Sequence, residues 1–221
     1  MIPRSTASEA ASPLASVSGR PWARTAALVV AGALGTALGA RLEIPLPFTP
    51  VPITLQTLFV LLAGGLLGAR SGTASQGVYL LAGGLGLPVF AGGAFGFGHL
   101  AGPTGGYLLG FLAAPWVVGR LLSSPAPAAG GDVPGSFRTL LALFAGGLVI
   151  FLLGLAQLAV YLAWGGGAGQ SAPASVWDLV RRTLYLGFWP FLPGFFVKLA
   201  LAWGIVRTFR APARRLAGDG R

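Results

Sequence analysis

The 221-residue sequence contains no cysteine, a single histidine and only five acidic residues. Without cysteine there is no disulfide framework, thiol nucleophile or cysteine metal site, and one histidine excludes a zinc site built from several histidines. Charged residues make up 9% of the chain and hydrophobic residues 54%, whereas ordinary soluble domains carry about 25% charged residues. Most of the surface therefore needs lipid around it, which predicts an all-α integral membrane protein.

The sequence also lacks the motifs of common enzymes and pumps. No G-x-x-x-x-G-K-[ST] segment is present to hold ATP phosphates, and no acid lies close enough to the lone His99 for a Ser/His/Asp triad. No Asp or Glu falls within an apolar run, which disfavours proton coupling through an intramembrane relay. We expect a protein that is not an enzyme and that obtains any ATP energy from another subunit.

Six apolar runs cover residues 25–40, 54–69, 72–87, 104–122, 139–164 and 183–208. A spanning helix needs about 20 apolar residues, and the short early runs are rich in glycine, as in tilted or closely packed helices. The segment 68–72 indicates a tight turn between the second and third runs. We predict a six-transmembrane-helix bundle over residues 22–209, with Pro-, Ala- and Gly-rich residues 123–136 as a flexible linker.

The formal charge of +10 follows the membrane topology and does not indicate nucleic-acid binding. Basic residues flank the apolar runs, and no basic groove interleaved with aromatic residues is present. With the N-terminus placed inside, eleven arginines lie on the cytoplasmic side, at 4, 20, 24, 70, 120, 138, 207, 210, 214, 215 and 221. Three lie outside, at 41, 181 and 182. This bias predicts that both termini are cytoplasmic in a multi-pass protein of the plasma membrane, with anionic lipid as a further partner of the basic residues.

The sequence predicts a tail at each end of the chain. Residues 1–21 are rich in Ala, Ser and Pro and predict a disordered cytoplasmic segment. A cleaved signal peptide is the alternative, which the long leader containing Glu9 disfavours. Residues 210–221 form a basic cytoplasmic tail.

Small residues recur every four positions in the first run, at Ala27, Ala31, Gly35 and Gly39. This spacing places them on one helix face, where another helix can approach closely. Packing within the bundle and docking of a partner membrane protein both explain the stripe.

Two predicted external loops carry the unusual sequence. Residues 41–57 are apolar and contain four prolines, at 45, 47, 50 and 52, so they cannot form a regular helix. Residues 86–107 combine many glycines with Phe90, Phe95, Phe97 and Tyr107. Irregular backbone at membrane depth must be buried in protein or line a cavity. Compact turns are one explanation, and a shared lid over a ligand is the other.

Lys198 is the ionisable residue that falls well inside a predicted span. A lone charge there is costly, so we expect it to face a cavity or to pair with a ligand carboxylate, with snorkelling to the interface as the alternative. His99 is a weaker candidate, because loop histidines are more often solvated or hydrogen-bonded than bound to a ligand.

The loops resemble the BioY family, the biotin-binding substrate component of energy-coupling-factor (ECF) transporters. The resemblance spans roughly residues 25–208 and is carried by residues 50–56, Tyr79 with 83–86, 86–93, 102–108 and 190–194 followed by Lys198. It implies a six-helix bundle that holds one biotin near the outer face as a transported ligand, with no cofactor of its own. It also implies a transmembrane coupling protein and two ATP-binding subunits as partners, docked on the small-residue stripe.

One position departs from the family. Members typically carry Asp three residues before the lysine, where this chain has Phe195. Lys198 then lacks an acidic partner and would rely on the carboxylate of the ligand, with His99 as a possible substitute contact. A substrate component for another small vitamin or cofactor precursor, and a structural membrane protein without a transported ligand, therefore stay open. We predict that the following residues bind the ligand: Lys198, Thr54, Gln56, Phe90, Gly92, Gly93, His99, Gly102, Thr104, Tyr107 and Phe195.

Overall fold

The computed structural model describes residues 21–123, 135–165 and 172–218. The predicted N-terminal tail, apart from its last residue, and most of the predicted linker lie outside these ranges. Five helical stretches are long and apolar enough to cross a membrane: Pro21–Arg41, Gln56–Gly84, Gly105–Ser123, Gly135–Ala163 and Val176–Arg210. The all-α membrane architecture expected from the composition is therefore present.

The second of these stretches is a helical hairpin. It consists of α2 (Gln56–Leu62), a short π-helix η2 (Ala63–Leu67) and α3 (Gly68–Gly84). Gly68 has a φ of +80°, a value that glycine adopts without strain, and the chain reverses there. A Cβ at Gly72 would lie 2.7 Å from the carbonyl oxygen of Ala63, so the start of α3 packs backbone to backbone on η2. The turn falls at the segment that the sequence predicted.

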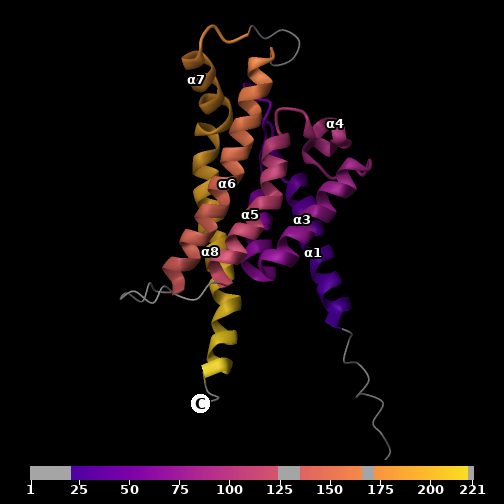
Figure 1. Cartoon of the computed structure of the whole chain (residues 1–221), viewed down its shortest axis with the longest axis vertical. Coiled ribbons are helices and arrows are strands. Elements are labelled where there is room, and N and C mark those ends of the chain that lie inside the picture. The colour runs from indigo at the N-terminus through magenta and orange to yellow at the C-terminus, as the bar shows by residue number, and fades with distance from the viewer. Residues whose placement is uncertain (1–20, 124–134, 166–171, 219–221) are drawn as a thin grey trace, which may run out of the picture.

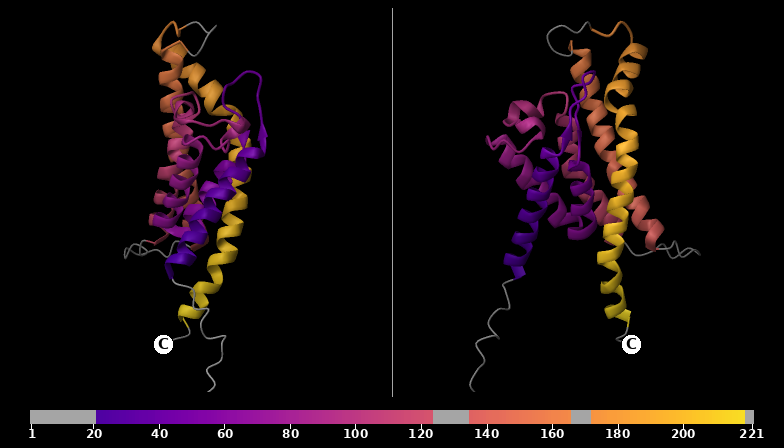
Figure 2. Two further views of the ribbon diagram at one scale, coloured as in Figure 1. Left: turned by 90° about the vertical axis from the view of Figure 1, so that its right-hand side faces the viewer. Right: turned by 180° about the vertical axis from the view of Figure 1, so that it is seen from behind.

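The remaining long helices are α1 (Pro21–Arg41), α5 (Gly105–Ser123), α6 (Gly135–Ala163), α7 (Val176–Gly187) and α8 (Leu192–Gly218). The start of α1 and the end of α8 lie at the same end of the bundle, and the irregular segments gather at the opposite end (Figures 1 and 2). We call this opposite end the loop end. Helix α8 continues into the predicted C-terminal tail and ends at Gly218.

The sixth predicted span, 183–208, is not a continuous helix. Helix α7 ends at Gly187, a 3-10 turn η4 occupies Trp189–Phe191, and α8 starts at Leu192. The physical reason is the pair Pro190 and Pro193: proline lacks an amide donor and is tolerated at the first turn of a helix but not in its interior. The interruption leaves a short helix α7 packed on α6 above the start of α8 (Figure 1).

Helices α5 and α6 share the most extensive contact of the helix pairs that the structure describes, and glycine allows their backbones to approach closely. A Cβ at Gly110 would lie 2.8 Å from the Cα of Ile150. A Cβ at Gly106 would overlap the carbonyl oxygen of Leu153 and approach the Cβ of Gln157 at 2.7 Å. Close backbone approach of this kind is how membrane helices gain van der Waals contact without a hydrophobic driving force between them.

The small-residue stripe of α1 divides into two parts. Gly35 and Gly39 face Phe59 of α2, whose ring would lie 2.9 and 2.8 Å from a Cβ at these positions. Ala27 and Ala31 are exposed. The half of the stripe nearest the loop end is thus occupied by packing within the chain, whereas the other half is uncovered.

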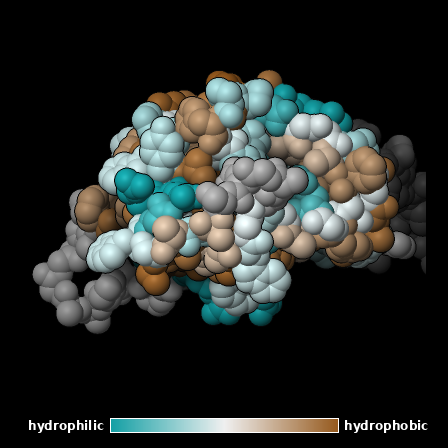
Figure 3. All heavy atoms as spheres, turned by 90° about the horizontal axis from the view of Figure 1, so that it is seen from above, coloured by the Kyte–Doolittle hydropathy of each residue, from teal (hydrophilic) through white to brown (hydrophobic). Residues whose placement is uncertain are grey.

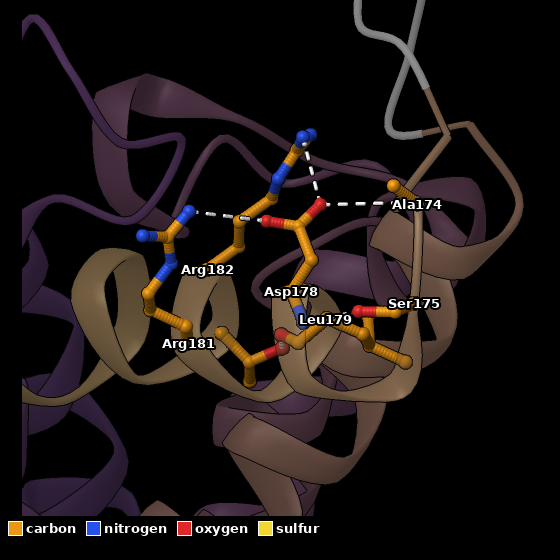
Figure 4. Close-up of polar contacts among 7 residues, drawn as sticks. Ala174, Ser175, Asp178, Leu179, Arg181 and Arg182 are labelled. Carbon is orange, nitrogen blue, oxygen red and sulfur yellow. Dashed lines mark hydrogen bonds and ion pairs between the residues drawn. The ribbon is translucent and has the colours of Figure 1, made fainter.

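Arg181 and Arg182, two of the three arginines predicted to lie outside, are neutralised in part by one acid. Asp178 accepts from Arg182 at 2.9 Å and from Arg181 at 3.4 Å, as Figure 4 shows. The acid also fixes the start of α7, because its amide donates to the Ser175 hydroxyl and its carboxylate accepts from the Ala174 amide. Asp178 therefore offsets part of the positive charge at this end of the bundle.

Candidate functional site

A cavity of about 340 Å³ lies beneath the irregular segments of the loop end. We call it the outer cavity. Segments far apart in the sequence form its wall: the 41–57 segment, the 90–104 segment and the adjoining parts of α5, α6, η4 and α8. Nine of the eleven predicted ligand-binding residues line it, namely Thr54, Gln56, Phe90, Gly92, His99, Thr104, Tyr107, Phe195 and Lys198. Sequence reasoning therefore identified nine residues that line the cavity, and the rest of the wall comes from residues that it did not single out.

The 41–57 segment covers the cavity as a short ribbon. Strands β1 (Glu43–Ile44) and β2 (Ile53–Thr54) pair antiparallel, with Glu43 opposite Thr54. The prolines between the strands hold the apolar tip in an irregular course, and Thr49 in the tip donates to the carbonyl oxygen of Leu186 at 2.6 Å. The expectation that this segment is not helical is confirmed, and the segment is tied to the bundle at its tip.

Lys198 of α8 points into the outer cavity and is buried. Its ammonium donates to the carbonyl oxygen of Thr54 at 3.0 Å, and it forms no salt bridge with any residue that the structure describes. An ammonium so placed keeps unused donors, because the group has three. The alternative of snorkelling toward an interface does not hold, since the side chain is enclosed.

A hydrogen-bonded chain joins this lysine to the second external loop. The Thr54 hydroxyl donates to Gln56 Oε1 at 3.0 Å, and Gln56 Nε2 donates to the Tyr79 hydroxyl at 2.6 Å. Tyr79 in turn donates to the carbonyl oxygen of Val89 at 3.2 Å. Gln56 and Tyr79 are both buried, so the ribbon, α2, α3 and the loop after α3 hold one another in position.

Phe195 forms an apolar wall beside Lys198. Its ring packs edge-on against Phe151 at 5.3 Å between centroids and fills the space above Gly147 of α6. Because the two residues are three positions apart on α8, they lie on the same helix face. At this place the cavity therefore presents an aromatic surface next to the ammonium group.

His99 of the short helix α4 (Phe97–Leu100) lies at the side of the cavity. Its ring stacks on Phe90 at 5.4 Å between centroids, and its Nε2 lies 3.2 Å from the Thr104 hydroxyl. Partial burial lowers the pKa of the imidazole from its ordinary value of 6.5. The neutral form therefore predominates at pH 7, and the ring can exchange a hydrogen bond with a neutral partner.

This shift predicts a pH effect on stability. The unfolded chain takes up a proton at His99 at higher pH than the folded chain, so stability falls as the pH drops below 6.5. We expect His99→Phe, which keeps the stack on Phe90, to reduce the loss of thermal midpoint between pH 7.5 and pH 5.5. If the thermal midpoint of the variant fell as much as that of the wild type over this pH range, His99 would not contribute to the pH dependence of stability.

Of three further residues that we predicted to bind the ligand, one lines the cavity and two do not. Tyr107 of α5 lines the cavity and donates to the carbonyl oxygen of Gly187 at 2.8 Å, tying α5 to the end of α7. Gly93 and Gly102 do not line the cavity. Gly93 has a φ of +71° in the 3-10 turn η3 (Ala91–Gly93), and the carbonyl oxygen of Gly102 accepts from Gln157 of α6 at 3.0 Å. Both shape the loop and do not form the wall.

Sequence reasoning missed several parts of the wall. Glu43 lines the cavity from β1, while Phe111, Ile150 and Phe151 line it from α5 and α6. The three apolar residues sit within long apolar runs, where nothing in the pattern separates a cavity-facing side chain from one that faces lipid. For Glu43 a signal existed, because it is the acid in an otherwise apolar loop.

Viewed from the loop end, the surface carries hydrophilic residues in separate patches between apolar ones (Figure 3). The outer cavity beneath has one buried ammonium group, several neutral hydrogen-bonding side chains and many aromatic and aliphatic residues. Ligand sites of small molecules are typically apolar pockets of roughly 300–1,000 Å³ with a few placed polar groups. The fold and the site together define a multi-pass membrane protein that encloses a small, partly apolar ligand near one membrane face.

Comparison with known proteins gives the same class. The model of the BioY family matches residues 7–215, so this chain belongs to the BioY family. The biotin transporter BioY of Thermotoga maritima is 35% identical over 176 residues, which cover 79% of this chain and 90% of that protein. The biotin transporter BioY of Rhodobacter capsulatus is 37% identical over 177 residues, which cover 80% and 87% of the two chains.

A solved structure is also similar. The crystal structure of the S-component for biotin from an ECF-type ABC transporter superposes with a TM-score of 0.66 at 27% sequence identity. The match covers 86% of this chain and 92% of that chain. The relatives are transport proteins, and this chain is accordingly a membrane transport component and not an enzyme.

Proposed function

We propose that this chain is the biotin-binding substrate component of an ECF transporter in the plasma membrane. The observation that carries the proposal is the buried Lys198 ammonium in the outer cavity, with no carboxylate of the described chain paired to it. Buried charges require compensation, and biotin carries a carboxylate at the end of an apolar chain. The relatives named as biotin transporters support the same ligand.

The proposed binding mode uses polar and apolar residues of the cavity wall. The valerate carboxylate would accept from Lys198, in addition to or in place of the Thr54 carbonyl oxygen. Thr54 and Gln56 would contact the ureido ring, and the aromatic wall that includes Phe90 and Phe195 would cover the apolar part of the ligand. The ribbon 41–57 would serve as the lid over the bound molecule.

We infer six transmembrane segments with both termini in the cytoplasm. The hairpin at Gly68 divides one of the five apolar stretches into two antiparallel arms, which supports the sixth segment. The start of α1 and the end of α8 share one end of the molecule (Figure 1). Most of the arginines that the structure describes belong to this end, which supports its assignment to the cytoplasmic side.

The proposed partners are a transmembrane coupling protein and two ATP-binding subunits, with biotin as cargo and no resident cofactor. The exposed positions Ala27 and Ala31 on α1 support a docking surface at the cytoplasmic half of this helix. Small residues there would let a helix of the coupling protein approach closely. Gly35 and Gly39 belong to the internal contact with α2 and are not part of this proposed surface.

A binding titration of the purified protein tests the function. We expect biotin to bind at 1:1 stoichiometry, at least about a hundredfold more tightly than other water-soluble vitamins, and to raise the thermal midpoint by ligand linkage. Mass spectrometry of material that copurifies with the protein should find biotin. Preferential binding of a different vitamin would contradict the ligand, and absence of any shift with all vitamins would contradict the transport role.

A further inference from the structure

Glu43 is the acid in the wall of the outer cavity, and nothing in the binding mode above uses it. It lies on β1 directly opposite Thr54 of β2. In an antiparallel pair, opposite residues have Cβ atoms about 5 Å apart and on the same face. Because the Thr54 carbonyl oxygen accepts from Lys198, the ribbon connects a carboxylate and an ammonium group at the same cavity.

The Glu43 side chain is held in one orientation. Its Oε2 accepts from the amide of Gly92 at 2.7 Å, and Gly92 has a φ of +67°, which presents this amide to the ribbon. Arg41, at the end of α1, donates to the carbonyl oxygen of Pro88 at 2.7 Å and ties down the same loop. A carboxylate anchored through one oxygen presents its second oxygen to a ligand at a lower ordering cost.

The second oxygen is free for a ligand. Within the part of the chain that the structure describes, Glu43 Oε1 has no hydrogen-bond partner, although a carboxylate can accept about four hydrogen bonds. The other strong polar groups of the wall are already engaged, as Gln56 is with Thr54 and Tyr79 and Tyr107 is with Gly187. From α8, the wall has the Lys198 ammonium group and the Phe195 ring.

We propose that Glu43 is a specificity-determining residue whose free carboxylate oxygen accepts hydrogen bonds from N–H donors of the ligand. The cavity would then select molecules that carry both an acceptor or anion for Lys198 and N–H donors for Glu43. This inference rests on the proposed function, because the ureido ring of biotin carries two such N–H groups and its valerate carries the anion. Glu43 and Lys198 would together orient the ligand in the cavity.

The test compares biotin with an analogue methylated on the ureido nitrogens. Glu43→Gln keeps an oxygen that can accept from Gly92 but loses the negative charge that strengthens a hydrogen bond. Since hydrogen bonds to charged groups are worth about tenfold to a hundredfold in affinity, we expect Glu43→Gln to weaken biotin by about tenfold or more. The methylated analogue, which already lacks the donors, should lose less than about threefold.

Arg41→Ala is the matched control, because it releases the same loop without touching the proposed acceptor. It should weaken biotin and the analogue equally. Equal losses of both ligands in Glu43→Gln, or the same discrimination in Arg41→Ala, would show that Glu43 only fastens the loop and would overturn the inference. Wild-type protein that fails to bind biotin at all would instead contradict the proposed function, so the two failures can be told apart.

Discussion

Replacing Lys198 by alanine should weaken the binding of biotin by about a hundredfold, the upper end of the range for a hydrogen bond to a charged group. The loss arises because the enclosed ammonium of Lys198 is the cation that can meet the ligand carboxylate in the outer cavity. A biotin amide or ester, which carries no negative charge, should lose much less. Isothermal titration of both ligands against both proteins measures the difference.

A matched control is available on the same helix. Arg207 of α8 stacks on Trp203 at 4.7 Å and does not line the outer cavity. Arg207→Ala removes one positive charge from the chain, as Lys198→Ala does, and should leave both affinities within about twofold. If Lys198→Ala weakened biotin and the blocked analogue by equal factors, Lys198 would not bind the carboxylate.

Placing leucine at Gly106 should produce the largest loss of stability of any single change considered. Any side chain there would overlap the carbonyl oxygen of Leu153, and backbone atoms of α6 cannot move aside as a flexible side chain can. Overpacking commonly costs about 1–3 kcal/mol and more where the backbone must shift. We expect the thermal midpoint in detergent to fall by more than 10 °C, by the scaling of roughly 2–4 °C per kcal/mol for a chain of this size, or folded protein to be lost altogether.

Gly204→Leu is the control for this change. Gly204 lies within α8, and nothing lies within 4 Å of a Cβ built at its position. The same substitution there should change the midpoint by no more than about 2 °C. A Gly106→Leu protein as stable as Gly204→Leu would show that α5 and α6 are not packed as closely as the structure has them.

These two residues show what could be predicted from the sequence. Lys198 was identified because an ionisable group within an apolar run has a cost that function must offset, and the structure encloses it. Gly106 belongs to a glycine-rich motif that marked the resemblance, but its partner could not be named. Contacts between helices depend on which faces meet, and the nearly uniform apolar composition of α5 and α6 contains little information about those faces.

The 183–208 run and the wall of the cavity show the limits more sharply. From hydropathy alone, the last span was predicted to continue through Pro190 and Pro193. These prolines interrupt the helix, because proline has no amide donor. The prolines of the 41–57 segment were interpreted correctly because they are dense enough to exclude a helix. The contact of Glu43 with Gly92 could not be predicted, because it joins two loops that are more than forty residues apart in the sequence. No local pattern encodes such a contact.

An experimental structure of the purified protein with biotin bound tests the role of the outer cavity most directly. We expect one biotin inside the outer cavity, with a carboxylate oxygen within about 3 Å of Lys198 Nζ, the distance of a charge-assisted hydrogen bond. A biotin molecule bound elsewhere would contradict this expectation. So would one in the cavity with its carboxylate directed away from Lys198 and the ammonium still bonded to the Thr54 carbonyl oxygen alone.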